Sequence, residues 1–126
     1  MNSWNPRIDH IGIAAEDLDE SEKFWKLIGL IPVGSDEYIK DQSVIVRMLP
    51  IPSDTEKEPR IELIKSTNEQ GPISRFIKKK GIGIQQICIK VDYLEELLIH
   101  LLDNDIRLID KEPRIGAGGK KIAFVH

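Results

Sequence analysis

Two residues that can bind a metal ion or move a proton lie on segments that read as strands. His10 stands within the isoleucine-rich segment 8–13, and Glu62 stands between Ile61 and Leu63. Imidazole nitrogen and carboxylate oxygen together suit a borderline divalent ion such as zinc, cobalt, nickel or manganese. This pair is the clearest indication of chemistry in the sequence.

Each of these residues also has an ordinary structural explanation. A lone strand histidine is often a half-buried residue satisfied by hydrogen bonds. Strand alternation places Ile61 and Leu63 on one face and Glu62 on the other, so this carboxylate meets either solvent or a polar cavity. Cys88, between two isoleucines, is interpreted as a buried small hydrophobe because no base adjoins it.

The elements that must position these residues form an internal repeat. Segments 8–13 and 84–89 share three isoleucines at matching places, which aligns His10 with Gln86, 76 positions later. Both segments are predicted to be strands. Equivalent strand positions in such a repeat are expected to face a shared cleft, so Gln86 joins His10 and Glu62 as a candidate metal ligand.

An amphipathic helix is predicted after each repeated strand, from its acidic start and the spacing of its apolar residues. Asp17 with Glu20, and Asp92 with Glu95, each resemble a capping box. A third helix, at about 71–80, begins at Pro72 and links the two copies.

The remaining strands follow from apolar runs bounded by turn residues. They are predicted near 31–38, 44–49 and 60–64 in the first copy and near 106–109 and 121–125 in the second, with a loop at Pro50, Pro52 and Asp54 and a glycine-rich turn at 116–119. The second-copy counterpart of the strand at 60–64 would fall beyond His126. We therefore expect either that the chain is truncated or that this strand has been lost.

These elements predict an α+β fold in which two βαβββ modules form a curved, mostly antiparallel sheet cup, the second module lacking its last strand. Residues 1–126 are expected to form one domain, with the first module at about 6–66 and the second at about 82–126. The chain of 126 residues is 40% hydrophobic and 31% charged, an ordinary globular balance.

Composition excludes several classes of function. The formal net charge of -3 gives no electrostatic case for nucleic acid. No apolar run approaches the roughly 20 residues that a membrane span requires. The single cysteine and the absence of a signal-peptide pattern at the N-terminus predict a cytoplasmic location.

The chain resembles the methylmalonyl-CoA epimerase family, within the vicinal-oxygen-chelate (glyoxalase-like) superfamily. The segments that carry this resemblance are 8–14, 60–63, 71–76, 91–92, 107–110, 113–119 and 122–126. Its most specific parts are the proline-led linker helix and the Gly-Ala-Gly-Gly loop.

The resemblance implies one divalent metal ion, of the cobalt, zinc, nickel or manganese class. His10 and Glu62 match two ligands of the family, the second histidine of the family falls at Gln86, and its final glutamate, a proposed base, would lie beyond His126. Substrate contacts are expected in the loop, at Gly118, Gly119 and Lys120.

The implied activity is epimerisation of methylmalonyl-CoA at C2, in which a proton next to the thioester carbonyl is removed through a metal-stabilised enolate. The partners implied are an acyl-CoA substrate and a second copy of the chain in a homodimer. Two alternatives stay open: a glyoxalase-like lyase or isomerase, and an inactive binding protein on the same scaffold, the latter favoured by the neutral amide of Gln86.

Overall fold

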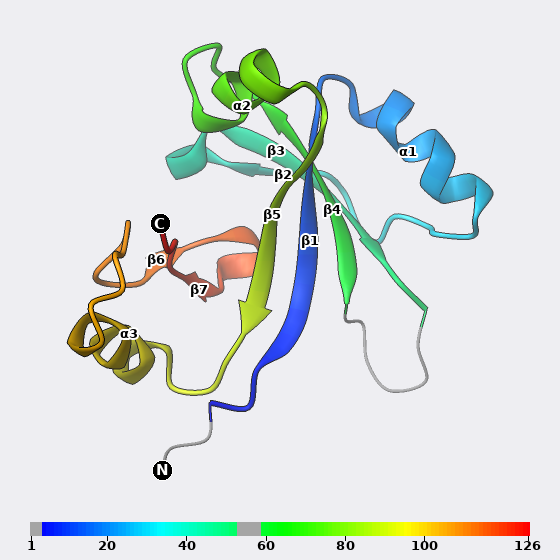
Figure 1. Cartoon of the computed structure of the whole chain (residues 1–126). Coiled ribbons are helices and arrows are strands. Elements are labelled where there is room, and N and C mark those ends of the chain that lie inside the picture. Colours follow the sequence, from blue (N-terminus) through cyan, green and yellow to red (C-terminus); the bar gives the residue numbers. More distant parts are fainter. Residues whose placement is uncertain (1–3, 53–58) are drawn as a thin grey trace. The chain divides into compact units, whose positions relative to one another are not determined.

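The computed structural model describes residues 4–52 and 59–126 of the chain (Figure 1). The described elements, in chain order, are β1 (Arg7–Ala15), α1 (Leu18–Leu27), β2 (Glu37–Ile39), η1 (Lys40–Gln42), β3 (Val44–Pro50), β4 (Arg60–Ser66), α2 (Pro72–Lys80), β5 (Gly83–Lys90), α3 (Leu94–Asp103), β6 (Arg114–Ile115), η2 (Ala117–Gly119) and β7 (Lys121–Ile122). The fold class is α+β, as predicted. Among the described helices, none has the length and apolar composition to cross a membrane.

The chain divides into two units, residues 8–89 and residues 1–7 with 90–126, and each is described by itself. The first unit contains a five-stranded sheet in the order β2-β3-β4-β1-β5. β2, β3 and β4 pair antiparallel, whereas β1 pairs with β4 in parallel. The two repeated strands, β1 and β5, are thus neighbours in one sheet, although 67 residues lie between Ala15 at the end of β1 and Gly83 at the start of β5.

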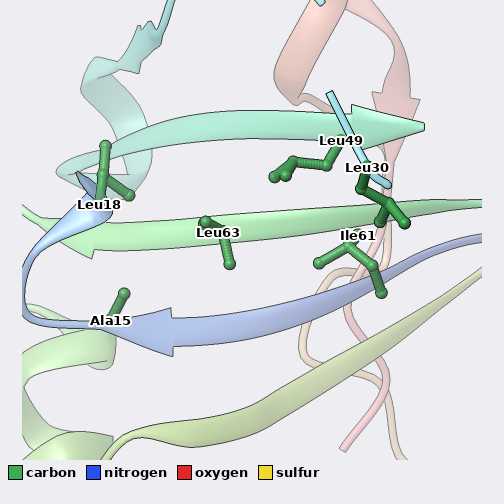
Figure 2. Packing of buried hydrophobic residues seen from close by; sticks show 6 residues of the cluster. All are labelled: Ala15, Leu18, Leu30, Leu49, Ile61 and Leu63. Carbon is green, nitrogen blue, oxygen red and sulfur yellow. The ribbon is translucent and has the colours of Figure 1, made fainter. Parts of the chain in front are cut away.

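One face of this sheet packs against α1. Alternation directs Ile61 and Leu63 of β4 to this face, where they meet Leu18 of α1 and Leu49 of β3 in a buried cluster (Figure 2). Asp17 begins the helix, because its carboxylate accepts a hydrogen bond from the Glu20 backbone N–H at 3.0 Å. This face therefore forms part of the core, and Arg60 and Glu62 of β4 point to the opposite face.

The linker helix α2 begins at Pro72, as predicted, and buries Ile73. Its last turn carries Lys78, Lys79 and Lys80, which suit the negative end of the helix dipole. Gly81 then ends the helix with a φ of 81°, a conformation that glycine adopts without steric cost.

The prediction for 31–38 is wrong over most of its length, because only Glu37–Ile39 forms strand β2. Pro32 lacks a backbone N–H, and Gly34 has a φ of 71°, which interrupts extended backbone. The predicted strands at 44–49 and 60–64 are confirmed as β3 and β4. Of the loop markers, Asp54 lies outside the described residues.

The second unit, residues 1–7 and 90–126, contains α3 and a two-stranded antiparallel sheet of β6 and β7. The capping box at Asp92 is wrong: the residue that precedes α3 is Tyr93, with a φ of 60° and no side-chain cap. Asp92 instead lies 3.4 Å from Arg7 Nη1 and donates its backbone N–H to Trp4.

The strands predicted at 106–109 and 121–125 are mostly absent from the described structure. A single bridge between Leu108 and Val125 is what forms there, while β7 covers only Lys121–Ile122. The positive φ of Asp105, 64°, turns the chain just before the first of these segments.

Candidate metal centre

The sheet face opposite the α1 core carries all three predicted ligands. His10 and Gly12 point to this face from β1, and Glu62 of β4 is the register partner of Gly12. Gln86 of β5 covers the same glycine, since a Cβ added to Gly12 would lie 2.5 Å from Gln86 Cγ. The structure therefore brings His10, Glu62 and Gln86 onto one face of three neighbouring strands.

His10 and Glu62 face each other inside the protein, with 8% and 4% of their surfaces exposed. The alternative that Glu62 lies in solvent is therefore wrong. His10 Nε2 is 3.2 Å from Glu62 Oε2, yet this oxygen makes no hydrogen bond with any described residue. Two donors at metal-ligand distance on one divalent ion lie about 2.9–3.4 Å apart, for angles between octahedral and tetrahedral. The spacing of this pair, the His10–Glu62 pair, fits a shared cation.

Asp9 and Arg60 hold the imidazole of His10 from its other side. Asp9 Oδ2 lies 2.7 Å from His10 Nδ1 and accepts a hydrogen bond from Arg60 Nη2 at 2.6 Å. Arg60 is also the register partner of His10 on β4. A carboxylate at Nδ1 favours the tautomer that carries its proton there, which leaves the Nε2 lone pair directed toward Glu62.

Burial raises the pKa of the Glu62 carboxyl above its usual value, although electrostatic interaction with His10 and Arg60 opposes this shift in pKa. Negative charge on Asp9 and Glu37 adds to the increase in this pKa. A cation at the His10–Glu62 pair would stabilise the ionised carboxylate and displace its proton.

Glu37 is a residue of this face that the sequence analysis missed. It is exposed, and its register partner on β3 is Val46, which in turn pairs with Ile64 of β4 on the same face as Glu62. Its segment was predicted to be extended, but only the register of β2 on β3 shows which face Glu37 occupies.

Cys88 lies in polar surroundings, contrary to its interpretation as a buried hydrophobe. It is half-buried, and its Sγ, one carboxylate oxygen of Asp9 and one ring nitrogen of His10 lie within 4.8 Å of one another. The neighbouring base that the sequence did not reveal is His10, which strand pairing of β1 with β5 brings alongside. The structure thus contains an Asp9–His10–Cys88 group able to hold a metal ion.

The predicted substrate residues Gly118, Gly119 and Lys120 lie at η2 and its C-cap in the unit that comprises 1–7 and 90–126. Gly118 and Gly119 have φ values of 69° and 73°, so the turn requires glycine at both positions. Their contact with substrate stays a prediction.

A basic hollow of about 490 Å³ lies along α2 and the start of β5. The residues that line it are Pro72, Arg75, Phe76, Lys78, Lys79, Lys80 and Gln85. The Oε1 atom of Gln85 is buried and makes no hydrogen bond with any residue that the structure describes. The four cationic side chains and the one aromatic ring that line the hollow suit a phosphorylated ligand.

Comparison with known proteins places the chain in a family. Residues 9–124 match the model of the Glyoxalase/Bleomycin resistance protein/Dioxygenase superfamily. The chain therefore belongs to this superfamily, as the resemblance implied.

Individual proteins similar to this chain include an uncharacterized protein and several methylmalonyl-CoA epimerases. The uncharacterized protein YqjC of Bacillus subtilis is 34% identical over 94% of this chain and 81% of its own length. The mitochondrial methylmalonyl-CoA epimerase of Bos taurus is 30% identical over 98% of this chain and 69% of its own length. Among solved structures, a Streptomyces coelicolor methylmalonyl-CoA epimerase variant in complex with 2-nitronate-propionyl-CoA matches with a TM-score of 0.88 and 30% identity, covering 98% of this chain and 86% of the other. The chain thus has methylmalonyl-CoA epimerases among its homologues.

Proposed function

We propose that this protein is a metal-dependent epimerase that removes and returns the C2 proton of methylmalonyl-CoA. The observation that carries the proposal is the buried His10–Glu62 pair, whose two acceptor atoms face each other at 3.2 Å. Support comes from homologues of about 30% identity that are methylmalonyl-CoA epimerases.

The reaction sets the demands on the site. A proton next to a thioester carbonyl leaves only if the resulting negative charge is stabilised on oxygen. A divalent ion, when bound, supplies this stabilisation as a Lewis acid. We assign its binding to His10 Nε2 and Glu62 Oε2, with the Gln86 amide oxygen as a third, weaker donor from β5.

The chain's own residues prepare these donors. Asp9 orients His10 through Nδ1, and Arg60 neutralises the Asp9 carboxylate at 2.6 Å. Packing of Ile61 and Leu63 into the core fixes the strand that carries Glu62. The metal ligands are thereby held before any cation binds.

A base must also reach C2. We propose Glu37 for this role, because it is an exposed carboxylate on the face of the His10–Glu62 pair and its charge raises the pKa of Glu62. An exposed carboxylate can exchange its proton with solvent between removal and return, so substrate C2 would take up solvent deuterium.

The CoA moiety requires a site for its phosphates. The basic hollow at Arg75 and 78–80 is one candidate, and Lys120, at the C-cap of η2, is another. Reversal of charge at Lys79 is expected to weaken CoA affinity if the hollow is used, and unchanged affinity in this variant would exclude it. We also propose a homodimer, on the basis of the family resemblance, which light scattering of the purified chain would test.

Deuterium uptake at C2 of methylmalonyl-CoA tests the function. Uptake is expected with the purified chain, is expected to vanish on chelation, and is expected to return with added cobalt. His10→Ala should abolish it by loss of metal, whereas Glu37→Gln should abolish it with cobalt affinity unchanged. Glu20→Gln, at an exposed carboxylate that binds Lys23 on α1, is the matched control and should keep full activity. Absence of uptake in every metal-loaded preparation would overturn the proposal.

A second candidate function is metal-free binding of an acyl-CoA, favoured by the neutral amide at Gln86. It predicts a CoA-thioester affinity that a chelator does not change. The same titration, repeated with and without chelator, therefore separates the two candidates.

A further inference from the structure

Cys88 lies where it can extend the His10–Glu62 pair. Gln86 occupies the face of β5 that meets Gly12, and Cys88, two residues further along the strand, shares this face. Since β1 lies between β4 and β5, Glu62, His10 and Cys88 come from three adjacent strands.

The thiol of Cys88 lies near the imidazole of His10. Sγ of Cys88, a ring nitrogen of His10 and a carboxylate oxygen of Asp9 are all within 4.8 Å of one another. On one tetrahedral zinc ion a nitrogen and a sulfur ligand lie about 3.6 Å apart, so joint binding requires the cysteine side chain to move toward the imidazole.

A second observation points to a ligand beside His10. Glu62 Oε2 is buried and makes no hydrogen bond within the described residues, although the residue is only 4% exposed. A carboxylate oxygen in that state is stabilised by a cation. Asp9, by contrast, already contacts both His10 and Arg60 through Oδ2, which leaves it the role of orienting the imidazole.

We propose that Cys88 binds the metal ion together with His10 and Glu62, and that its thiolate takes the place of the imidazole that Gln86 does not supply. This inference rests on the proposed metal-dependent function. On binding, the S–H bond breaks, the proton leaves to solvent and a sulfur–metal bond forms. Thiolate is a soft ligand, so the site prefers zinc, cobalt and cadmium to manganese and magnesium.

Cobalt spectroscopy tests this directly, because the chain contains a single cysteine. Cobalt(II) bound to thiolate has a near-ultraviolet charge-transfer absorption that cobalt bound only to nitrogen and oxygen lacks. Titration of the full chain with cobalt should produce this absorption, with saturation at one equivalent. Cys88→Ser should lose the absorption and weaken cobalt binding at least tenfold, with the circular dichroism spectrum unchanged.

Two controls keep the result tied to the site. His10→Ala should reduce the affinity of the absorbing species at least tenfold, and an absorption that persists there at unchanged affinity would show adventitious binding by the thiol and overturn the proposal. In the unmodified chain, cobalt should slow alkylation of Cys88 by iodoacetamide at least tenfold, a measurement that needs no variant.

The failure of this inference is distinguishable from failure of the proposed function. Saturable cobalt binding without the charge-transfer absorption would overturn the role of Cys88, as would the absence of saturable binding. Deuterium uptake at C2, measured on the same preparations, reports the epimerase separately: uptake without the absorption leaves the function standing and removes Cys88 from the metal.

Discussion

The contact between Gly12 and Gln86 gives a quantitative prediction about how the site is assembled. A Cβ at Gly12 would lie 2.5 Å from Gln86 Cγ, 3.0 Å from Gln86 Nε2 and 3.0 Å from Ile64 Cδ1. The first distance is at least about 1 Å inside the optimum for two carbon atoms, roughly 3.5–4.0 Å. Gly12→Ala must therefore displace the Gln86 side chain.

The expected cost follows from opposing effects. Insertion of a methyl group into a packed site costs about 1–3 kcal/mol. Because Gly12 is not among the positive-φ residues, alanine can adopt its backbone conformation. The substitution also lowers the conformational entropy of the unfolded chain, which stabilises the folded protein by about 0.4–1 kcal/mol. We expect Gly12→Ala to destabilise the protein by about 1–2 kcal/mol.

A double-mutant cycle assigns this cost to one contact. In a Gln86→Ala background two of the three nearest atoms are gone, so the cost of Gly12→Ala should fall close to zero. Urea unfolding of the four proteins should give a coupling free energy of about 1 kcal/mol, above the 0.3–0.5 kcal/mol within which independent sites add. Equal costs of Gly12→Ala in the two backgrounds would refute the placement of Gln86 over Gly12.

Three further predictions concern the site, the core and an ion pair. Asp9→Asn should weaken cobalt affinity about 10–100-fold by releasing His10, whereas Asp36→Asn, which also removes an aspartate that binds an arginine, should leave this affinity unchanged in the same titration. Leu63→Ala should cost about 2–5 kcal/mol in urea unfolding because Leu63 is 0% exposed, and Leu27→Ala, at 85% exposure, should cost less than about 0.5 kcal/mol; similar costs would contradict the assigned core. The hydrogen bond from Arg47 lowers the pKa of Asp36 below 3.8, so the ionised Asp36 stabilises the fold at neutral pH, and this stabilisation is lost as pH falls through the folded-state pKa. The difference in unfolding free energy between the unmodified chain and Asp36→Asn should therefore shrink on acidification. A difference that stays constant down to pH 2 would contradict this cause.

Local pattern was sufficient for much of the sheet. Alternation around Glu62 identified which side of β4 enters the core, and matched isoleucines located both β1 and β5. The same reasoning failed at Asp92, where helix capping depended on the left-handed backbone of Tyr93 and on a contact with Arg7. Capping requires backbone geometry that residue types alone do not specify, which is why the match at Asp17 succeeded and that at Asp92 did not.

The surroundings of His10 show a different limit of sequence reasoning. Asp9 adjoins it in sequence, but Arg60 and Cys88, which follow it by 50 and 78 positions, reach it only through the pairing of β1 with β4 and β5. Because of this long-range pairing, Asp9 orients the imidazole of His10 on one side, and on the other side the imidazole faces a buried Glu62 oxygen that makes no hydrogen bond with the described residues. The donors at His10, Glu62, Gln86 and Cys88 all belong to the unit of residues 8–89, so cobalt titration of the full chain examines them without any assumption about the placement of 90–126. Metal binding and its ligand set can therefore be established before the catalytic base or the CoA contacts are known.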